Sequence, residues 1–125
     1  MSKYLALDIG QKHTGVAFYD DKTEIVMPLA TIEHQKQSDL VRQIEQLVQE
    51  RSITHLVLGD PLLLSGEAGA QSDIVHAVAQ ALSLPPSTAL FWLDERYSNP
   101  RQSVNPHAEA ACELLKTFIK KTVDK

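Results

Sequence analysis

Carboxylates stand at the ends of three apolar segments of this sequence. They are Asp8, Asp60 and the adjacent pair Asp94-Glu95. If the fold brings them together, they repel one another unless a cation lies between them, and hard oxygen ligands favour Mg²⁺ or Mn²⁺. Such an ion activates water and stabilises the leaving oxygen of a phosphodiester. The candidate chemistry is therefore metal-dependent hydrolysis of a phosphodiester.

Five strands are predicted around these residues. Three segments rich in β-formers come first, and the short polar turns between them force neighbouring strands to be antiparallel. Two shorter apolar runs follow, typical of strands buried on both faces of a sheet. Pro28 favours an edge position for the third strand, because proline has no N–H to donate to a ladder. The predicted strands are 3–9, 15–19, 24–32, 56–59 and 89–93.

Three helices are predicted from apolar residues at helical spacing, over 40–48, 74–82 and 106–119. Ser38 is a candidate cap for the first, and Asn105-Pro106 supplies a cap and a first-turn proline for the last. The order is therefore βββαβαβα, an α/β fold with a five-stranded mixed sheet flanked by helices. Crossovers make the later strands parallel to the first, and ligands bind beyond the carboxyl ends of such strands. The acidic residues would meet at that edge.

Bulk properties set the expected context. The chain of 125 residues has the length and composition of one globular domain, spanning residues 1–125. It shows no signal-peptide pattern and no apolar run of membrane-spanning length, so we expect a cytoplasmic protein without a membrane partner. We expect a monomer or a weak homodimer. The single cysteine, Cys112, lies on an apolar helical face and is expected in the core. The net charge of −4 argues against a large surface that coats nucleic acid but permits a local basic patch.

Two regions near the acidic residues add candidate polar groups. Lys12 and His13 follow Gly10 and could meet phosphate oxygens. His107, at the second position of a helix, feels the positive end of the helix dipole, which disfavours the imidazolium. A neutral imidazole can bind a metal or accept a proton, although a surface histidine near a cap is equally expected here.

The acidic residues also have plainer interpretations. Asp60 precedes a proline, so ordinary turn chemistry explains it as well as a functional role does. Asp94 and Glu95 could form a solvated cluster in which Arg96 pairs with one of them. Only one of two adjacent strand residues can point into a site, and we favour Glu95.

Short motifs occur in a specific order along nearly the whole chain. They are Leu5-Ala-Leu-Asp-Ile-Gly with Gly15-Val-Ala, Pro28-Leu-Ala-Thr-Ile, Val57-Leu-Gly-Asp-Pro-Leu with Ser65-Gly-Glu, Leu93-Asp-Glu-Arg-Tyr-Ser, and Ala108-Glu-Ala-Ala. The ordered set resembles the YqgF (RuvX) family. The resemblance implies a ribonuclease H-like fold and an activity as a Holliday-junction resolvase or a pre-16S ribosomal RNA nuclease.

The resemblance also implies site residues. Asp8 corresponds to the catalytic aspartate of the first strand, and Glu95 to the acid of the family's Asp-Glu-Arg motif, which includes Arg96. A third aspartate normally opens the last helix, and this sequence has His107 there. Glu109 is a poor substitute, because two helical residues are about 200° apart around the axis.

Other departures from the family concern the surface around the site. The segment between the Asp-Glu-Arg motif and the last helix is shorter than usual, His13 stands where arginine is common, and Asp60 stands where an apolar residue is usual. The shorter segment, which lacks the helix usual in the family, would remove part of the surface that could hold a nucleic acid.

The leading hypothesis is a metal-dependent endonuclease acting on pre-rRNA or branched DNA. Asp8 and Glu95 would bind Mg²⁺ or Mn²⁺, and His107 would complete the metal site or act on the water. Lys12, His13 and Arg96 would contact the substrate. A second hypothesis is a divergent, non-catalytic domain that binds RNA or a protein partner through the same edge. A nucleotide-binding fragment of the actin/sugar-kinase type ranks last, because that architecture needs two such domains.

Overall fold

The computed structural model describes the backbone of residues 2–60, 70–94 and 106–123. The strands are β1 (Lys3–Ile9), β2 (His13–Asp20), β3 (Ile25–Glu33), β4 (His55–Asp60) and β5 (Ala89–Asp94). The helices are α1 (Gln37–Glu50), α2 (Ala70–Ala81) and α3 (Pro106–Val123). This order confirms the predicted βββαβαβα arrangement.

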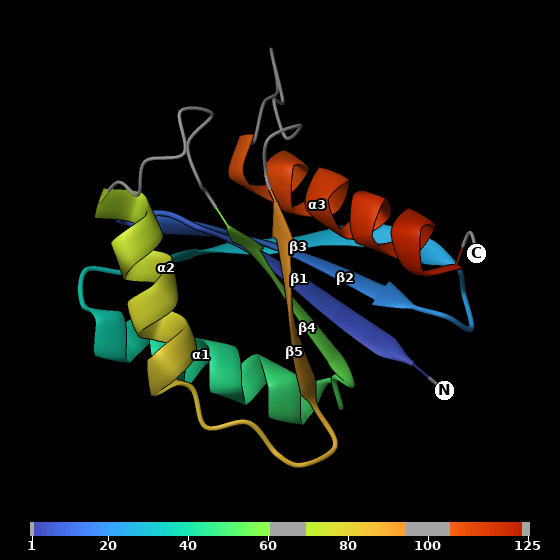
Figure 1. Cartoon of the computed structure of the whole chain (residues 1–125), viewed down its shortest axis with the longest axis horizontal. Helices are drawn as coiled ribbons and strands as arrows, with labels where there is room; N and C mark the ends of the chain where they lie inside the picture. Colours follow the sequence, from blue (N-terminus) through green and yellow to red (C-terminus); the bar gives the residue numbers. More distant parts are fainter. Residues whose placement is uncertain (1, 61–69, 95–105, 124–125) are drawn as a thin grey trace.

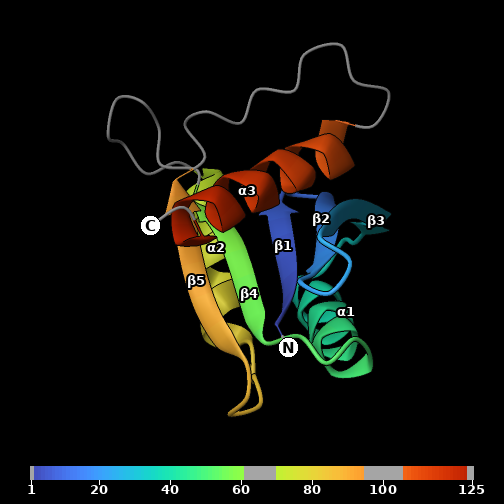
Figure 2. The same ribbon diagram turned by 90° about the vertical axis from the view of Figure 1, so that its right-hand side faces the viewer.

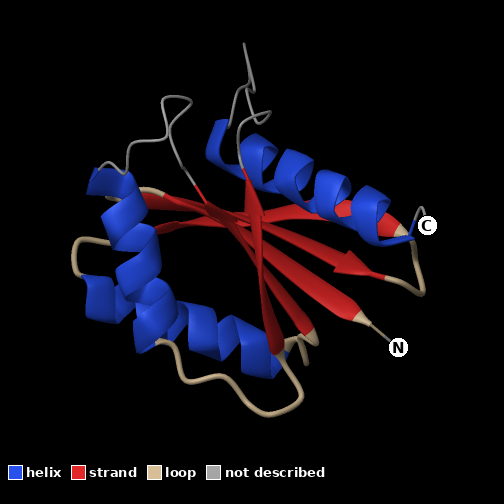
Figure 3. Ribbon diagram, in the orientation of Figure 1, coloured by secondary structure: helices blue, strands red, loops and turns tan. Residues whose placement is uncertain are grey.

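One sheet of five strands forms the centre of the molecule, in the order β3-β2-β1-β4-β5. The three strands β1, β2 and β3 pair antiparallel, and β1, β4 and β5 pair parallel, as the sequence predicts. Helices α1 and α2 cover one face of the sheet, and α3 covers the other (Figures 1, 2 and 3). Pro28 lies in an edge strand, which confirms the position predicted from its missing N–H.

Each face of the sheet has its own apolar core. Leu5 and Leu7 of β1 pack with residues of α1 and α2. Tyr4 and Ala6, the alternate residues of the same strand, pack with residues of α3. Because β1 is central and covered on both sides, it is apolar along almost its whole length. Cys112 is buried in the α3 core, as predicted, and burial raises the pKa of its thiol.

The prediction that residues 89–93 form a strand buried on both faces is wrong. β5 lies at the edge of the sheet, where Leu93 is the one buried side chain among residues 89–93 and Trp92 is 40% exposed. An apolar run alone does not distinguish a central strand from an edge strand whose outer side stays open. No helix in residues 2–60, 70–94 and 106–123 is both long and apolar enough to cross a membrane.

The prediction of Ser38 as a helix cap is also wrong. α1 begins at Gln37, so Ser38 lies inside its first turn, and the N-cap is Lys36, which makes no side-chain capping hydrogen bond. The polar segment before the apolar face of α1 is helical as well. In this turn, Arg42 Nη2 donates a hydrogen bond of 2.8 Å to Asp39 Oδ1, and the resulting ion pair stabilises the helix slightly.

Candidate active site

Asp8 lies at the carboxyl end of β1, on the face of the sheet that α3 covers. Successive side chains of a strand point to opposite faces, and Asp8 shares the alternation of Tyr4 and Ala6, which belong to the α3 core. Its side chain is only partly exposed. The residue paired with it on β2 is Gly15, so no side chain from that neighbour stands beside the carboxylate. This leaves Asp8 accessible at the end of an otherwise apolar strand.

The start of α3 lies toward the same end of the sheet. Phe118, in the later part of α3, contacts Tyr4 near the beginning of β1, with ring centroids 6.1 Å apart. The helix therefore runs opposite to β1, and its first turn lies on the side where β1 ends (Figures 1 and 2). The backbone of His107 belongs to that turn. The fold thus places Asp8 and the first turn of α3 at one end of one face.

The parallel strands β4 and β5 end at the same edge of the sheet as β1, as predicted. Leu7 of β1 is level with Leu58 of β4, so Asp8 stands one residue beyond this pair. On the neighbouring strands, Asp60 is level with Asp94. The backbones of three acidic positions therefore reach the same edge of the sheet.

Other parts of the predicted site lie outside the described residues. Glu95 and Arg96 fall between the described ranges, and Asp60, Asp94 and His107 are described by their backbone alone. Among the side chains that the structure does describe, no three His, Cys, Asp or Glu residues are grouped so that they could hold a metal ion. The proposed ligand set stays a prediction.

The turn after Asp8 is tight and depends on Gly10. The Gly10 N–H donates to the carbonyl oxygen of His13 at 3.0 Å. A Cβ atom at Gly10 would lie 2.6 Å from that same oxygen, closer than real Cβ contacts. Only glycine therefore closes this turn without a backbone shift.

Gly10→Ala is expected to destabilise the protein by about 1 to 3 kcal/mol, the usual cost of adding a carbon atom where the structure has no room for it. Urea unfolding followed by circular dichroism measures the change. Gln11→Ala, an exposed position in the same turn, is the matched control and should unfold at the wild-type midpoint. Equal midpoints for the two variants would show that the turn relaxes without cost.

Lys12 and His13 lie in this turn and line a polar pocket of about 540 Å³. On the other side of the pocket is the first part of α1, including Arg42. His13 Nε2 lies 3.7 Å from a carboxylate oxygen of Glu33, and both side chains are largely exposed, so the pair adds little stability. Lys12 is exposed and follows Asp8 closely in the chain.

The turn after Asp8 is supported by a buried polar pair that the sequence does not predict. His34 Nε2 lies 2.9 Å from Thr14 Oγ1, and the two residues are 7% and 0% exposed. The His34 N–H also donates to the carbonyl oxygen of Lys12 at 2.9 Å. Thr14 is the residue before Gly15, which pairs with Asp8, so this contact helps to fix the position of the strand pair that carries Asp8.

Two histidines, the buried His34 and the partly buried His55, are expected to make the stability of the fold depend on pH. Burial lowers the pKa of His34, and the nearby His13 lowers it further. Burial also lowers the pKa of His55, although Asp21 acts in the opposite direction. The folded state therefore favours neutral rings, while the unfolded chain takes up protons near its ordinary pKa of about 6.5.

Stability is accordingly expected to fall as the pH falls below about 6.5, because the unfolded state then binds more protons than the folded state. Urea midpoints measured between neutral and mildly acidic pH test this. The double variant His34→Gln, His55→Gln should show a shallower pH dependence than wild type. Parallel curves for wild type and variant would contradict the assignment to these two rings.

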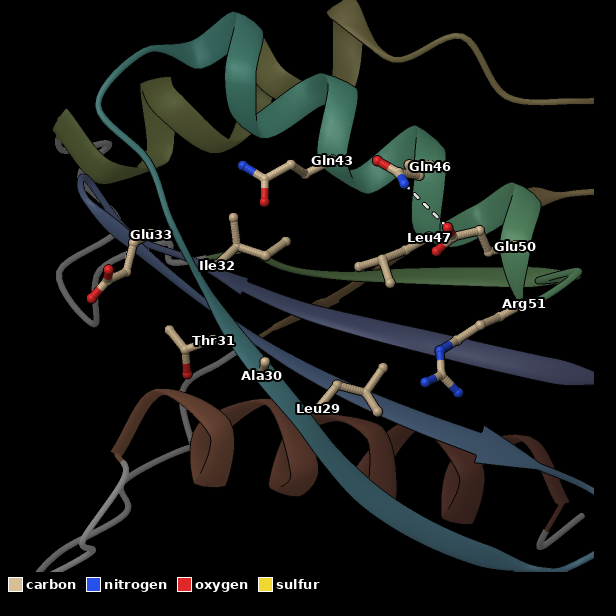
Figure 4. Close-up of a pocket in the computed structure, with 10 residues that line it drawn as sticks. All are labelled: Leu29, Ala30, Thr31, Ile32, Glu33, Gln43, Gln46, Leu47, Glu50 and Arg51. Atoms are coloured by element: carbon tan, nitrogen blue, oxygen red, sulfur yellow. Dashed lines mark hydrogen bonds between the residues drawn. The ribbon is translucent and has the colours of Figure 1, made fainter.

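A second groove lies between β3 and α1 (Figure 4). It has a volume of about 440 Å³. Leu29, Ile32 and Leu47 form its apolar part, and Gln46 donates to Glu50 at 3.1 Å along its rim. None of the predicted site residues lines it. It shares Glu33 and Gln43 with the pocket that Lys12 and His13 line, so the two hollows adjoin there.

Comparison with known proteins connects this geometry to a family. The family model described as "RuvX: Holliday junction resolvase" matches residues 2–111. A protein of Chloroflexus aurantiacus named "Putative pre-16S rRNA nuclease" is 39% identical over 95 residues, covering 76% of this chain and 62% of that protein. A protein of Crocosphaera subtropica with the same name is 38% identical over 95 residues, covering 76% of this chain and 66% of that protein. The match thus spans somewhat under two thirds of these relatives.

Solved structures support the fold. RuvC of Thermus thermophilus in complex with a Holliday junction substrate superposes with a TM-score of 0.67 at 7% identity, covering 96% of each chain. The Holliday junction resolvase of fowlpox virus superposes with a TM-score of 0.50 at 16% identity, covering 95% of this chain and 77% of that one. At such low identity these likenesses concern the fold alone, which is ribonuclease H-like. Because the family model covers most of the sequence, the chain belongs to the RuvX family.

Proposed function

We propose that this protein is a metal-dependent endonuclease that acts on structured nucleic acid in the cytoplasm, either precursor 16S rRNA or a Holliday-junction-like branch. The observation that carries the proposal is the position of Asp8, a partly exposed carboxylate at the carboxyl end of β1 on the face where α3 begins. Membership of the RuvX family and the names of the relatives support the same activity.

Carboxylate and imidazole groups suit a divalent ion. Asp8, Glu95 and His107 are the proposed ligands, because carboxylate oxygens are the donors that Mg²⁺ and Mn²⁺ prefer and Mn²⁺ also accepts imidazole. Bound there, such an ion supplies an activated water and stabilises the leaving oxygen of a phosphodiester.

Of the adjacent acids Asp94 and Glu95, we propose Glu95 as the partner of Asp8. Only one of two neighbouring strand residues can face a site, and Glu95 corresponds to the acid of the family's Asp-Glu-Arg motif.

The remaining proposed residues act on the proton and the phosphate. His107 either completes the ligand set or accepts a proton from the attacking water through a neutral ring nitrogen, since the start of a helix disfavours the imidazolium. Lys12, His13 and Arg96 would offset the charge of the substrate phosphates. The protein would act as a monomer or a weak homodimer.

A non-catalytic role in binding RNA or a protein partner is the second candidate. It is favoured by His107, which stands where the family has an aspartate, and by the net charge of −4. Both functions would use the same edge of the sheet, so cleavage is the measurement that separates them.

The test is incubation with precursor 16S rRNA and with a four-way DNA junction, each in Mg²⁺ and in Mn²⁺. We expect cleavage of at least one substrate, and His107→Ala should slow it by at least about 10- to 100-fold, the usual cost of disturbing even the outer groups of a metal site. Binding followed by fluorescence anisotropy should change little. If the wild type binds but cuts neither substrate with either ion, the non-catalytic function is correct.

A further inference from the structure

His34 holds the turn after Asp8 at two points. Its backbone N–H donates to the carbonyl oxygen of Lys12 at 2.9 Å, and its ring nitrogen Nε2 lies 2.9 Å from Thr14 Oγ1. The two contacts fall on the residues that flank His13, where β2 begins. A single residue just beyond the end of β3 therefore fixes both the end of the turn and the start of β2.

The ladder between β2 and β3 is short at this end of the hairpin. Its register shifts next to Thr14, where β3 carries one extra residue. A bulge of this kind interrupts the hydrogen bonds of the ladder locally. Beyond it, the pairs His13–Glu33 and Thr14–Ile32 join the two strands. The contacts of His34 extend this short stretch and hold the turn to β3.

The contact between the His34 ring and Thr14 is shielded from water. Thr14 is 0% exposed and His34 is 7% exposed. Water cannot replace a partner that is lost at such a site, so breaking the contact costs more than it would at the surface. The ring is thus held in one place. The backbone bond to Lys12 is held with it, because both contacts belong to the same residue.

We propose that His34 is a positioning residue for Lys12, which keeps the turn where the lysine side chain meets a phosphate of the nucleic acid substrate. This inference rests on the proposed function, in which Lys12 offsets the charge of a substrate phosphate. The ammonium group of lysine sits on a flexible stem, so the position of its backbone determines which phosphates it can reach. His34 acts on binding without touching the substrate.

The effect is measured as the Kd of a labelled four-way DNA junction and of labelled precursor 16S rRNA, by fluorescence anisotropy with Ca²⁺ in place of Mg²⁺. His34→Leu keeps a side chain of similar size without the ring nitrogen, and it should raise Kd by about 2- to 10-fold, as expected for the loss of one hydrogen bond. His34→Gln should restore most of the affinity, because its amide can donate or accept at the place of Nε2. The cleavage rate at saturating substrate should stay at the wild-type value. A lower rate at saturation with an unchanged Kd would overturn the inference.

A double-mutant cycle tests whether the effect passes through Lys12. Lys12→Ala removes the proposed phosphate contact. Adding His34→Leu to Lys12→Ala should then cause no further loss of affinity, because there is no lysine left to position. Independent losses that multiply in the double variant would show that His34 does not act through Lys12.

Thr88→Val is the matched control for Thr14→Val. Both variants remove a buried threonine hydroxyl: Thr88 is 8% exposed, and its Oγ1 donates to the carbonyl oxygen of Ile53 at 2.6 Å. Thr88 lies just before β5, level with the start of β1 and therefore at the other end of the sheet from Asp8. Thr14→Val should raise Kd as His34→Leu does, and Thr88→Val should leave it unchanged although urea unfolding shows a comparable loss of stability. An equal rise in Kd for both variants would mean a general loosening of the fold and would remove the positioning role.

The failure of this inference differs from the failure of the proposed function. If the wild type binds a substrate and His34→Leu binds it with the wild-type Kd, the positioning role is wrong and the proposed function is untouched. If the wild type binds neither the junction nor the precursor rRNA, the proposed function fails and the role of His34 fails with it.

Discussion

Replacing Asp8 with Asn is expected to lower the rate of metal-dependent cleavage by at least about 100-fold, because disturbing even outer groups of a metal site costs up to about that factor and Asp8 is proposed as a direct ligand. The amide keeps the size of the side chain and removes the charge that attracts the cation. Asp8 is partly exposed at the end of its strand, so the fold should survive. Cleavage rates in Mg²⁺ and Mn²⁺, together with a thermal melt, measure both effects.

The matched control for this variant is Asp73→Asn. Asp73 is an exposed carboxylate in the first turn of α2, on the other face of the sheet. It has the same chemistry and should leave cleavage unchanged. Cleavage that persists in Asp8→Asn at the wild-type rate would point to a contaminating nuclease and would remove the main support for the proposed activity.

Leu115→Ala is expected to lower the free energy of unfolding by about 2 to 5 kcal/mol, the usual cost of truncating a fully buried leucine and more than is expected for Gly10→Ala. Leu115 is 0% exposed and packs in the α3 core against the central strands. A loss of this size is a large part of the total stability of a typical domain, about 5 to 15 kcal/mol. Because His107 lies on the same helix, loosening α3 should also reduce cleavage below the melting temperature.

Lys116→Ala, one residue further along α3, is the control. The Lys116 side chain is 59% exposed and lies 3.8 Å from Glu113 in a surface ion pair. Truncating it should change the free energy of unfolding by less than about 0.5 kcal/mol. Chemical denaturation of both variants gives the comparison, and similar midpoints would mean that α3 is not anchored through Leu115.

Sequence patterns predicted the frame of this fold because its elements follow simple periodicities. The central strand β1 is apolar on both faces, α1 presents Leu40, Ile44 and Val48 to the core at helical spacing, and Pro106 opens α3. Local geometry and burial both determine the spacing of apolar residues, and that spacing can be read from the sequence. The position of Asp8 at the end of β1 followed from the same reasoning.

Features that depend on tertiary contacts could not be predicted in this way. The contact between Thr14 and His34 joins residues that are 20 positions apart, and neither residue type signals burial. The exposure of Trp92 depends on the position of β5 in the sheet and not on its composition. The ligand set around Asp8 likewise depends on side-chain positions that periodicity does not specify.

The outer strand β3 has a consequence for the behaviour of concentrated samples. Pro28 has no N–H to offer to a further strand. Nearby, the pairing with β2 passes from Thr14–Ile32 to Val16–Leu29, so β3 carries one extra residue, a bulge opposite Gly15. An added strand would meet both irregularities within one nine-residue segment. Although Ile25 and Met27 are exposed there, this edge is a poor template for amyloid-like growth, and the protein can carry an open strand without polymerising through it.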